Sequence, residues 1–317
     1  MIDQAWLNPV IAFVAGILLA FVLRKTFARV QLRRGPLVWL PGRWHDINRS
    51  KVLQPLYDIW KLFSKQTIIP HTATPLFIFG PVFAFACAVA AALFVPVAGV
   101  SFDYSFSLVV LFYLLLFEIL FVIMGGISSA SLFAAIGGVR EVELMLANEI
   151  PFILGLFALA ITYNTLSIQH MMGPNLLVNP FAAVAVLLAI IVKLHIKPFD
   201  IAEAESEIVG GLTTEYSGKL LGLLETTKVI MVFVLCALFA DLFLWVPSTG
   251  FVAWGVFIVG LVVTGLILGI VNALFARFRI DQATKWLFRI STLVSLLAVG
   301  WAFALPYALA FLGGHMP

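Results

Sequence analysis

The sequence predicts an all-α integral membrane protein with about eight transmembrane helices and one amphipathic helix at the membrane interface. The 317-residue chain is 62% apolar and only 11% charged, whereas soluble domains carry about 25% charged residues. Its apolar residues form segments long enough to cross a bilayer, and its Lys and Arg residues occupy alternate connections between those segments. Residues 1–317 are therefore expected to form a single polytopic membrane domain.

Eight apolar segments approach the roughly 20 residues that one transmembrane helix requires. They are residues 8–28, 75–97, 107–127, 147–164, 180–197, 217–245, 251–276 and 286–312. The first is about as long as a full span and runs directly into basic residues, which is not the pattern of a cleavable signal peptide.

The basic residues predict the orientation of these segments. Of the 19 Lys and Arg residues, all but Lys228 lie in or beside the connections after the first, third, fifth and seventh segments, which are loops 29–74, 128–146, 198–216 and 277–285. Lys228 lies in the first half of the sixth segment, nearest the same face. The connections after the second, fourth and sixth segments contain none. By the positive-inside rule the four basic loops lie in the cytoplasm, and both termini lie outside the cell membrane.

Residues 52–66 have a different pattern. The apolar residues Leu53, Leu56, Ile59, Trp60 and Phe63 recur at helical spacing, and polar residues such as Asp58 lie elsewhere on the helix surface. Pro55 suits the first turn of such a helix. The segment is too short and too polar to span a bilayer, so we expect it to lie at the cytoplasmic interface or against a partner.

The connection after the fifth segment holds a dense group of carboxylates, in the run KPFDIAEAESE (197–207). If this run is helical, Asp200, Glu203 and Glu207 share one face and Glu205 points away. Close carboxylates cannot all ionise cheaply, so this group, with Glu215 beyond it, is expected to accept protons or bind cations. The alternative is an acidic loop that is simply solvated.

Charged residues also lie inside or beside the spans. Glu118 is near the middle of the third segment, where a carboxyl is costly and therefore a functional candidate; the alternative is a protonated Glu that hydrogen-bonds between helices. Glu149 lies in the first turns of the fourth segment, after Arg140. Glu225 and Lys228 are three residues apart in the sixth segment and either take part in ion transfer or form a simple ion pair.

The sequence shows no metal or cofactor site in this chain. Cys87 and Cys236 are isolated in apolar segments, too few for a zinc or iron–sulfur site, and are best interpreted as small buried hydrophobes. The five His residues lack metal-ligand spacing, and no nucleotide-binding or nucleophile motif occurs. Redox chemistry would therefore belong to a partner.

Five stretches together resemble a known family. They are QLRRGP (31–36), LQPLYDIWKLFSKQTIIP (53–70), SLFAAIGGVREVELMLANEIP (131–151), KPFDIAEAESEIVGGLTTEYSG (197–218) and ARFRIDQ (276–282). They resemble the membrane subunit that anchors the peripheral arm of respiratory complex I, and its counterpart in membrane-bound energy-converting nickel–iron hydrogenases and formate hydrogenlyases. The complex I form usually reads GPN where this chain has Gly35-Pro36-Leu37, and the second and third stretches look more like the hydrogenase branch.

The resemblance implies that the chain anchors a hydrophilic redox arm at the membrane and starts a lateral chain of charges. The family's acidic loop is matched by Asp200, Glu203, Glu205, Glu207 and Glu215, and the residues flanking its fourth span are matched by Arg140 and Glu149. Arg34 matches the basic residue before Gly-Pro. Residues expected to help dock the arm are Arg33, Arg34, Asp58, Arg277, Arg279 and Asp281.

The favoured function is the membrane subunit of an energy-converting hydrogenase-type complex that couples electron transfer to H⁺ or Na⁺ translocation. The expected partners are hydrogenase-like large and small subunits, an iron–sulfur subunit and antiporter-like membrane subunits, with iron–sulfur clusters and a nickel–iron centre in the partners. The alternatives are the quinone-site subunit of a complex I-type enzyme, with flavin and quinone in the complex, a sulfur-reducing relative, and a stand-alone secondary transporter. No nucleic-acid partner is expected.

Overall fold

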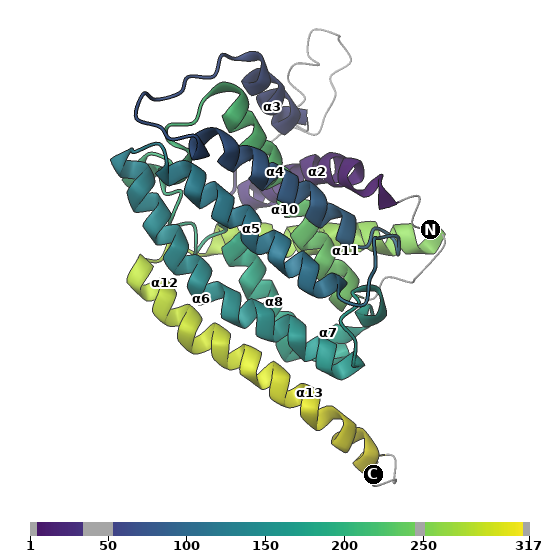
Figure 1. Ribbon diagram of the computed structural model, residues 1–317. Helices are drawn as coiled ribbons and strands as arrows, with labels where there is room; N and C mark the ends of the chain where they lie inside the picture. Colours follow the sequence, from purple (N-terminus) through teal and green to yellow (C-terminus); the bar gives the residue numbers. More distant parts are fainter. Residues whose placement is uncertain (1–4, 34–52, 245–250, 313–317) are drawn as a thin grey trace.

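The chain folds into a bundle of helices, as expected where lipid leaves backbone groups no other hydrogen-bonding partner. The computed structural model describes residues 5–33, 53–244 and 251–312. Within these ranges no β-strand is present, and the helices lie side by side with the C-terminal helix along one edge (Figure 1). The prediction of an all-α membrane protein is confirmed.

The helices follow one another with short connections. They are α2 (Asn8–Val30), α3 (Gln54–Ser64), α4 (Leu76–Phe94), α5 (Ser107–Ile127), α6 (Leu132–Tyr163), α7 (Asn175–Val178), α8 (Pro180–Lys193), α9 (Glu205–Ile208), α10 (Gly218–Phe243), α11 (Phe251–Leu274), α12 (Ile280–Trp286) and α13 (Thr292–Leu312), with a π-helical turn at Leu287–Ser291 between the last two.

Seven helices in the described part of the chain are long and apolar enough to cross a membrane. The predicted fifth span is shorter, because α8 has only 14 residues and ends at Lys193 rather than at residue 197. The predicted fourth and eighth spans are longer, because α6 starts at Leu132 and the last helical run starts at Ile280. Much of the predicted loop 128–146 is therefore helix.

The glycine pair Gly137-Gly138 lies in the part of α6 where a loop is predicted. The pair lies inside the helix as a contact surface, not at a helix end. A Cβ added to Gly137 would lie 2.8 Å from the Cα of Gly211, and one added to Gly138 would lie 2.6 Å from Ile127. The missing side chains let the 194–217 loop and the end of α5 approach the α6 backbone closely.

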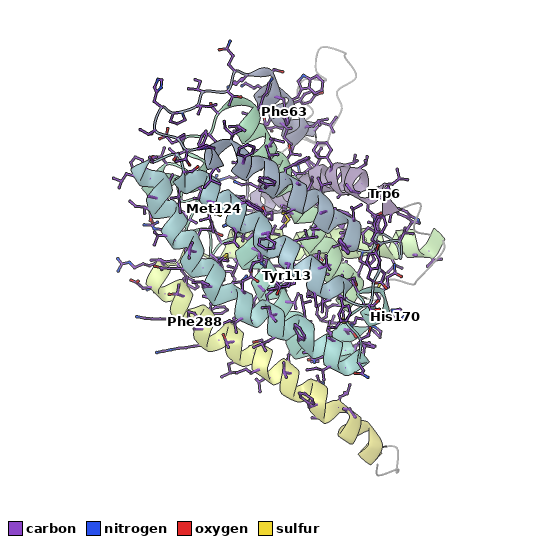
Figure 2. The ribbon with its side chains drawn as sticks, viewed as in Figure 1. Trp6, Phe63, Tyr113, Met124, His170 and Phe288 are labelled. Atoms are coloured by element: carbon purple, nitrogen blue, oxygen red, sulfur yellow. The ribbon has the colours of Figure 1, made fainter. Side chains whose placement is uncertain are left out.

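Helix α10 is the centre of the bundle. It packs against α2, α4, α8 and α11, and from Val229 to Phe243 nearly every side chain is buried. The short α3, predicted as the amphipathic helix, lies at one end beside α10 and α2 (Figures 1 and 2). Its Ile59 packs on Ile17 and Val229, with Leu56 beside them. Trp60, which the spacing places among the apolar residues, is 74% exposed, so only part of the predicted apolar face is buried.

The segment from Leu194 to Ser217 is mostly non-helical and is enclosed by the bundle. Tyr216 anchors it: the ring stacks on Phe77 with centroids 4.2 Å apart, and its hydroxyl donates to the Phe77 carbonyl at 3.1 Å. At Gly211, φ is +56° and an added Cβ would overlap the backbone oxygen of Ala202. Irregular backbone at membrane depth is tolerated where protein surrounds it or where it lines a cavity.

We predict that Gly211→Ala destabilises the protein by about 1–3 kcal/mol, because the position combines a left-handed backbone with no room for a methyl group. Thermal unfolding in detergent should show a melting temperature lowered by several degrees. The matched control is Gly255→Ala on α11, where an added Cβ meets nothing within 4 Å. Equal melting temperatures for the two variants would contradict this packing.

Candidate functional site

A cavity of about 560 Å³ lies where the enclosed 194–217 loop meets α5, α6, α8 and α10. We call it the charged cavity. Its charged lining residues are Glu118, Glu141, Lys193, His195, Lys197, Asp200, Glu203, Lys228 and Arg277. Apolar residues of α2, α5 and α10 complete the wall, among them Phe27, Ile119 and Met231. Charges of both signs thus face one enclosed space at the end of the bundle that carries the basic loops.

Three carboxylates of the 194–217 loop each meet a cation from a different element. Asp200 lies 2.6 Å from Arg277, which follows α11. Glu203 lies 2.7 Å from Lys228 on α10, and Glu207 lies 2.7 Å from Arg140 on α6. The loop is therefore tied by ion pairs to three separate parts of the bundle.

This arrangement differs from the predicted acidic helix. Only Glu205–Ile208 is helical, and Asp200 and Glu203 lie in irregular backbone before it, so Asp200, Glu203 and Glu207 do not share a helical face. Each carboxylate is instead neutralised by its own cation. Glu203 does not have the raised pKa that repulsion among close carboxylates would cause. Burial raises the pKa of Glu203, but Lys228 and His195 outweigh it and lower the pKa below its ordinary value.

His195 and Glu141 form a fourth polar contact in the same space. The His195 Nε2 lies 2.9 Å from Glu141 Oε2, and the Glu141 side chain is buried. Burial lowers the pKa of His195, but Glu141 and Glu203 outweigh burial and raise it to about 9. At neutral pH the imidazole is therefore charged and bridges α6 to the 194–217 loop.

The remaining predicted residues of the spans are Glu149, Glu118 and Glu225. Glu149 forms an ion pair with Lys193 between α6 and α8, and the Lys193 ammonium also lies 4.9 Å from the centre of the Phe152 ring. Glu118 lines the charged cavity. Glu225 lies 3.8 Å from Lys228, the predicted i, i+3 pair, but Lys228 lies closer to Glu203.

The other predicted positions lie outside the cavity or outside the described residues. Glu215 is half-buried in the loop before α10, and Glu205 lies in α9. Arg33, Asp58, Arg279 and Asp281 are exposed, whereas Arg277 turns inward to Asp200. Arg34 lies outside the described residues.

Sequence reasoning missed Glu141, Lys193 and His195 as members of the site. Glu141 and Asn148 are seven residues apart on α6 and both are buried, so their helical spacing within an apolar segment was an available signal. Nothing local marks His195, because a residue just after α8 enters the site through the fold of the following loop. No group of three or more side chains able to hold a metal ion occurs among the described residues.

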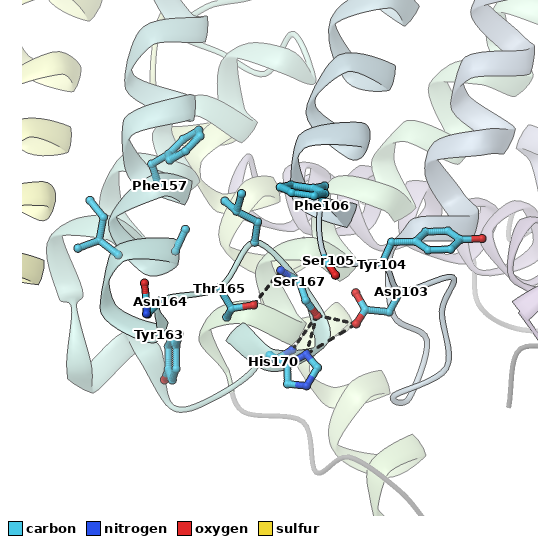
Figure 3. A pocket seen from close by; sticks show the side chains of 13 residues that line it. Asp103, Tyr104, Ser105, Phe106, Phe157, Tyr163, Asn164, Thr165, Ser167 and His170 are labelled. Atoms are coloured by element: carbon cyan, nitrogen blue, oxygen red, sulfur yellow. Dashed lines mark hydrogen bonds and ion pairs between the residues drawn. The ribbon is translucent and has the colours of Figure 1, made fainter.

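A second hollow of about 1090 Å³ lies at the other end of the bundle, between the loop before α5 and the end of α6 (Figure 3). There the Ser167 hydroxyl lies 2.5 Å from Asp103 Oδ2 and 2.7 Å from His170 Nδ1. In a hydrolase triad the His stands between the Ser and the Asp, whereas here the Ser stands between them. Ser107 also donates to Asp103 at 2.8 Å, so this cluster joins two loops.

Comparisons with known proteins cover nearly the whole chain. A family model described as NADH dehydrogenase matches residues 5–303. The H subunit of NADH-quinone oxidoreductase from Geobacillus sp. (strain WCH70) is 29% identical, covering 96% of this chain and 93% of that protein. The protein of the same name from Rubrobacter xylanophilus is 30% identical, covering 91% and 86%.

A chain of known structure has a closely similar fold. It comes from the membrane-bound sulfane sulfur reductase, an archaeal respiratory membrane complex. The TM-score is 0.84 at 27% sequence identity, and the match covers 94% of this chain and 98% of that one.

We predict that stability depends on the charge of His195. Its folded-state pKa of about 9 lies above the ordinary value near 6.5, so its contribution is fully present below about pH 6.5 and is lost as pH rises through about 9. The contribution is on the order of 3 kcal/mol. Melting temperatures between pH 6 and pH 10 should fall on the alkaline side.

The matched variant is His195→Gln, which retains a hydrogen-bonding side chain but does not titrate. It should be less stable than the wild type at pH 7 and should lack this part of the alkaline fall. A wild-type curve that stays parallel to the variant from pH 7 to pH 10 would contradict the assignment.

Proposed function

Because the chain belongs to the NADH dehydrogenase family and is a membrane subunit of a complex I-like respiratory complex, we propose that it couples electron transfer in a docked hydrophilic arm to the translocation of H⁺ or Na⁺. The observation that carries the proposal is the charged cavity. One irregular loop is held there by Asp200, Glu203 and Glu207, each paired with a cation on a different element.

Such a loop can respond to a change of charge because its pairs compete. Lys228 lies 2.7 Å from Glu203 and 3.8 Å from Glu225, and burial of His195 brings its charge near both Glu141 and Glu203. If one carboxylate takes up a proton, its cation loses its closest partner and favours the next carboxylate. The change in pairing then passes from α10 to the loop, and from the loop to α6 and to Arg277.

The strength of the electrostatic effect limits how far the redox centre can lie from the charged cavity. A unit charge at about 10 Å contributes about 1.7 kcal/mol at an effective dielectric constant near 20, which is close to one pKa unit. At much larger distances solvent and counterions screen it. The arm must therefore dock at the end of the bundle that holds the charged cavity, and we place that end in the cytoplasm on the positive-inside rule.

Residues at this end provide a docking surface. Asp58 and Trp60 are exposed on α3, Arg279 and Asp281 are exposed around the start of α12, and Arg33 is exposed after α2. These side chains present both charges and an aromatic ring, which suits a protein partner. Arg277, also expected to dock the arm, instead serves the charged cavity through Asp200.

The hydrogenase branch favoured by the sequence is not supported by the comparisons, whose named relatives are NADH-quinone oxidoreductase subunits and a sulfane sulfur reductase. The proposed coupling does not depend on which redox reaction the arm performs. We propose hydrophilic catalytic subunits, an iron–sulfur subunit and antiporter-like membrane subunits as partners, with the iron–sulfur clusters held by the partners. Purification of the intact complex, followed by mass spectrometry and metal analysis, would identify the branch through nickel, flavin or quinone.

A second candidate function is binding of a quinone head group in the charged cavity. The cavity volume of about 560 Å³ falls within the range of small-molecule sites, which combine an apolar wall with a few polar groups. The names of the curated relatives favour this candidate. Protection of wall residues such as Met231 from a photoreactive quinone by unlabelled quinone would support it, and unprotected labelling would contradict it.

We predict that the double variant Glu203→Gln, Glu207→Gln uncouples the complex. Removing both charges breaks the ion pairs of Lys228 and Arg140. A change of charge in the cavity can then no longer pass through the loop to α10 and α6. In complexes reconstituted in liposomes, ions moved per electron should fall at least several-fold while electron transfer by the arm continues.

The matched control is Asp103→Asn, which removes a carboxylate at the opposite end of the bundle, where the amide oxygen can still accept from Ser107 and the amide nitrogen can donate to the Ser167 hydroxyl. This variant should keep the wild-type ratio of ions to electrons. An unchanged ratio in the double variant would refute the role given to the loop.

A further inference from the structure

The outer face of α6 carries a single row of exposed residues along most of its length. The row consists of Ile136, Val139, Glu143, Leu146, Ile150 and Phe157, which are all exposed, with the half-buried Ile153 between the last two. The steps between successive members alternate between three and four residues throughout. That alternation is the spacing by which one helix packs against another in a coiled-coil-like seam.

Neighbouring helices confine this row to a narrow strip. Helix α5 packs on one side of α6 and α13 packs on the other, as Figure 1 shows. Towards the far end α5 and α6 separate, and a hollow of about 190 Å³ opens between them. Its lining is almost wholly apolar and includes Phe112 and Tyr113 of α5 with Ile153 and Phe157 of α6. The strip therefore ends in a shallow hollow at Ile153 and Phe157.

Glu143 is the one carboxylate in this apolar row. The preceding acidic residue, Glu141, points the other way and is buried against His195. Arg140, one turn before Glu143, is engaged by Glu207. Among the described residues no cation lies within ion-pair distance of the Glu143 carboxylate.

The position of Glu143 along the bundle makes its exposure costly. Gly138 of α6 is level with Ile127, the last residue of α5, because an added Cβ would lie 2.6 Å from the Ile127 side chain. Glu143 is five residues further along, about 7.5 Å deeper at 1.5 Å per residue. Helix α5 has 21 residues, just enough to cross the bilayer. A carboxylate at that depth is unfavourable against lipid chains.

We propose that the α6 row is the contact surface for one transmembrane helix of a partner subunit, and that this helix places a Lys or Arg side chain opposite Glu143. The seam supplies the packing surface, and the unmatched carboxylate supplies the charge that selects this helix. The inference rests on the chain being one subunit of a larger membrane complex and adds the place and the chemistry of one contact.

Site-directed photo-cross-linking in the intact complex tests whether a partner helix contacts the α6 row. Val139→Cys and Leu146→Cys would be made in a chain with Cys87→Ala and Cys236→Ala, labelled with benzophenone maleimide and irradiated in native membranes. The matched control is Val259→Cys on α11, which is 61% exposed against 58% for Val139. Both α6 positions should cross-link to one apolar helix that has a Lys or Arg within one turn, and the control should cross-link to lipid.

Reversing the two proposed charges, first on Glu143 and then on the partner helix, tests whether this ion pair selects the helix. Glu143→Lys should lower retention of the cross-linked subunit about tenfold in mild detergent, and changing the partner's cation to Glu should restore it. Retention of the hydrophilic arm by the Glu143→Lys complex shows that the chain still folds.

The two proposals fail in different ways. Purification of the chain without any partner would overturn the proposed function. The proposed helix contact alone would be overturned if partners copurify but Val139→Cys and Leu146→Cys label only lipid. It would also be overturned if the Glu143→Lys complex retains the subunit as well as the wild type does.

Discussion

The structure depends on one constraint: an irregular, charged loop lies inside a membrane bundle, where every charge needs a partner. The loop from Leu194 to Ser217 meets this constraint through ion pairs from Asp200, Glu203 and Glu207 to cations on three elements. Its backbone is enclosed by the surrounding helices, and glycines let those helices come close. These pairs are partly exposed, so together they connect the loop to three elements of the bundle while each contributes only modestly to stability.

This constraint also explains the unequal lengths of the helices. Helix α8 stops at Lys193 because the loop that follows turns back into the bundle, and Lys193 itself is satisfied there by Glu149. Helix α6 runs for 32 residues because its first turns form a wall for the same loop through Gly137. Shortening of one helix and lengthening of the other together create the space that becomes the charged cavity.

The sequence predicted what depends on local pattern and missed what depends on the path of the loop. Apolar runs of about 20 residues and the two-sided α3 segment predicted the helices well, because lipid exposure and amphipathicity act on each helix separately. The acidic run also marked the right loop. The pairing of Asp200 with Arg277 joins residues 77 positions apart, and His195 joins the site only through the fold, so neither could be read from spacing.

The proposed coupling requires a carboxyl group of the charged cavity to change its charge when the redox arm is reduced. Infrared difference spectroscopy of the intact complex, comparing oxidised and reduced arms, measures protonation of carboxyl groups directly. We expect a carboxyl C=O band that appears or disappears on reduction and is lost or shifted in Glu118→Gln, whereas Glu203 stays ionised because Lys228 and His195 lower its pKa. Difference spectra with no carboxyl band, or with a band that Glu118→Gln leaves unaltered, would contradict this coupling.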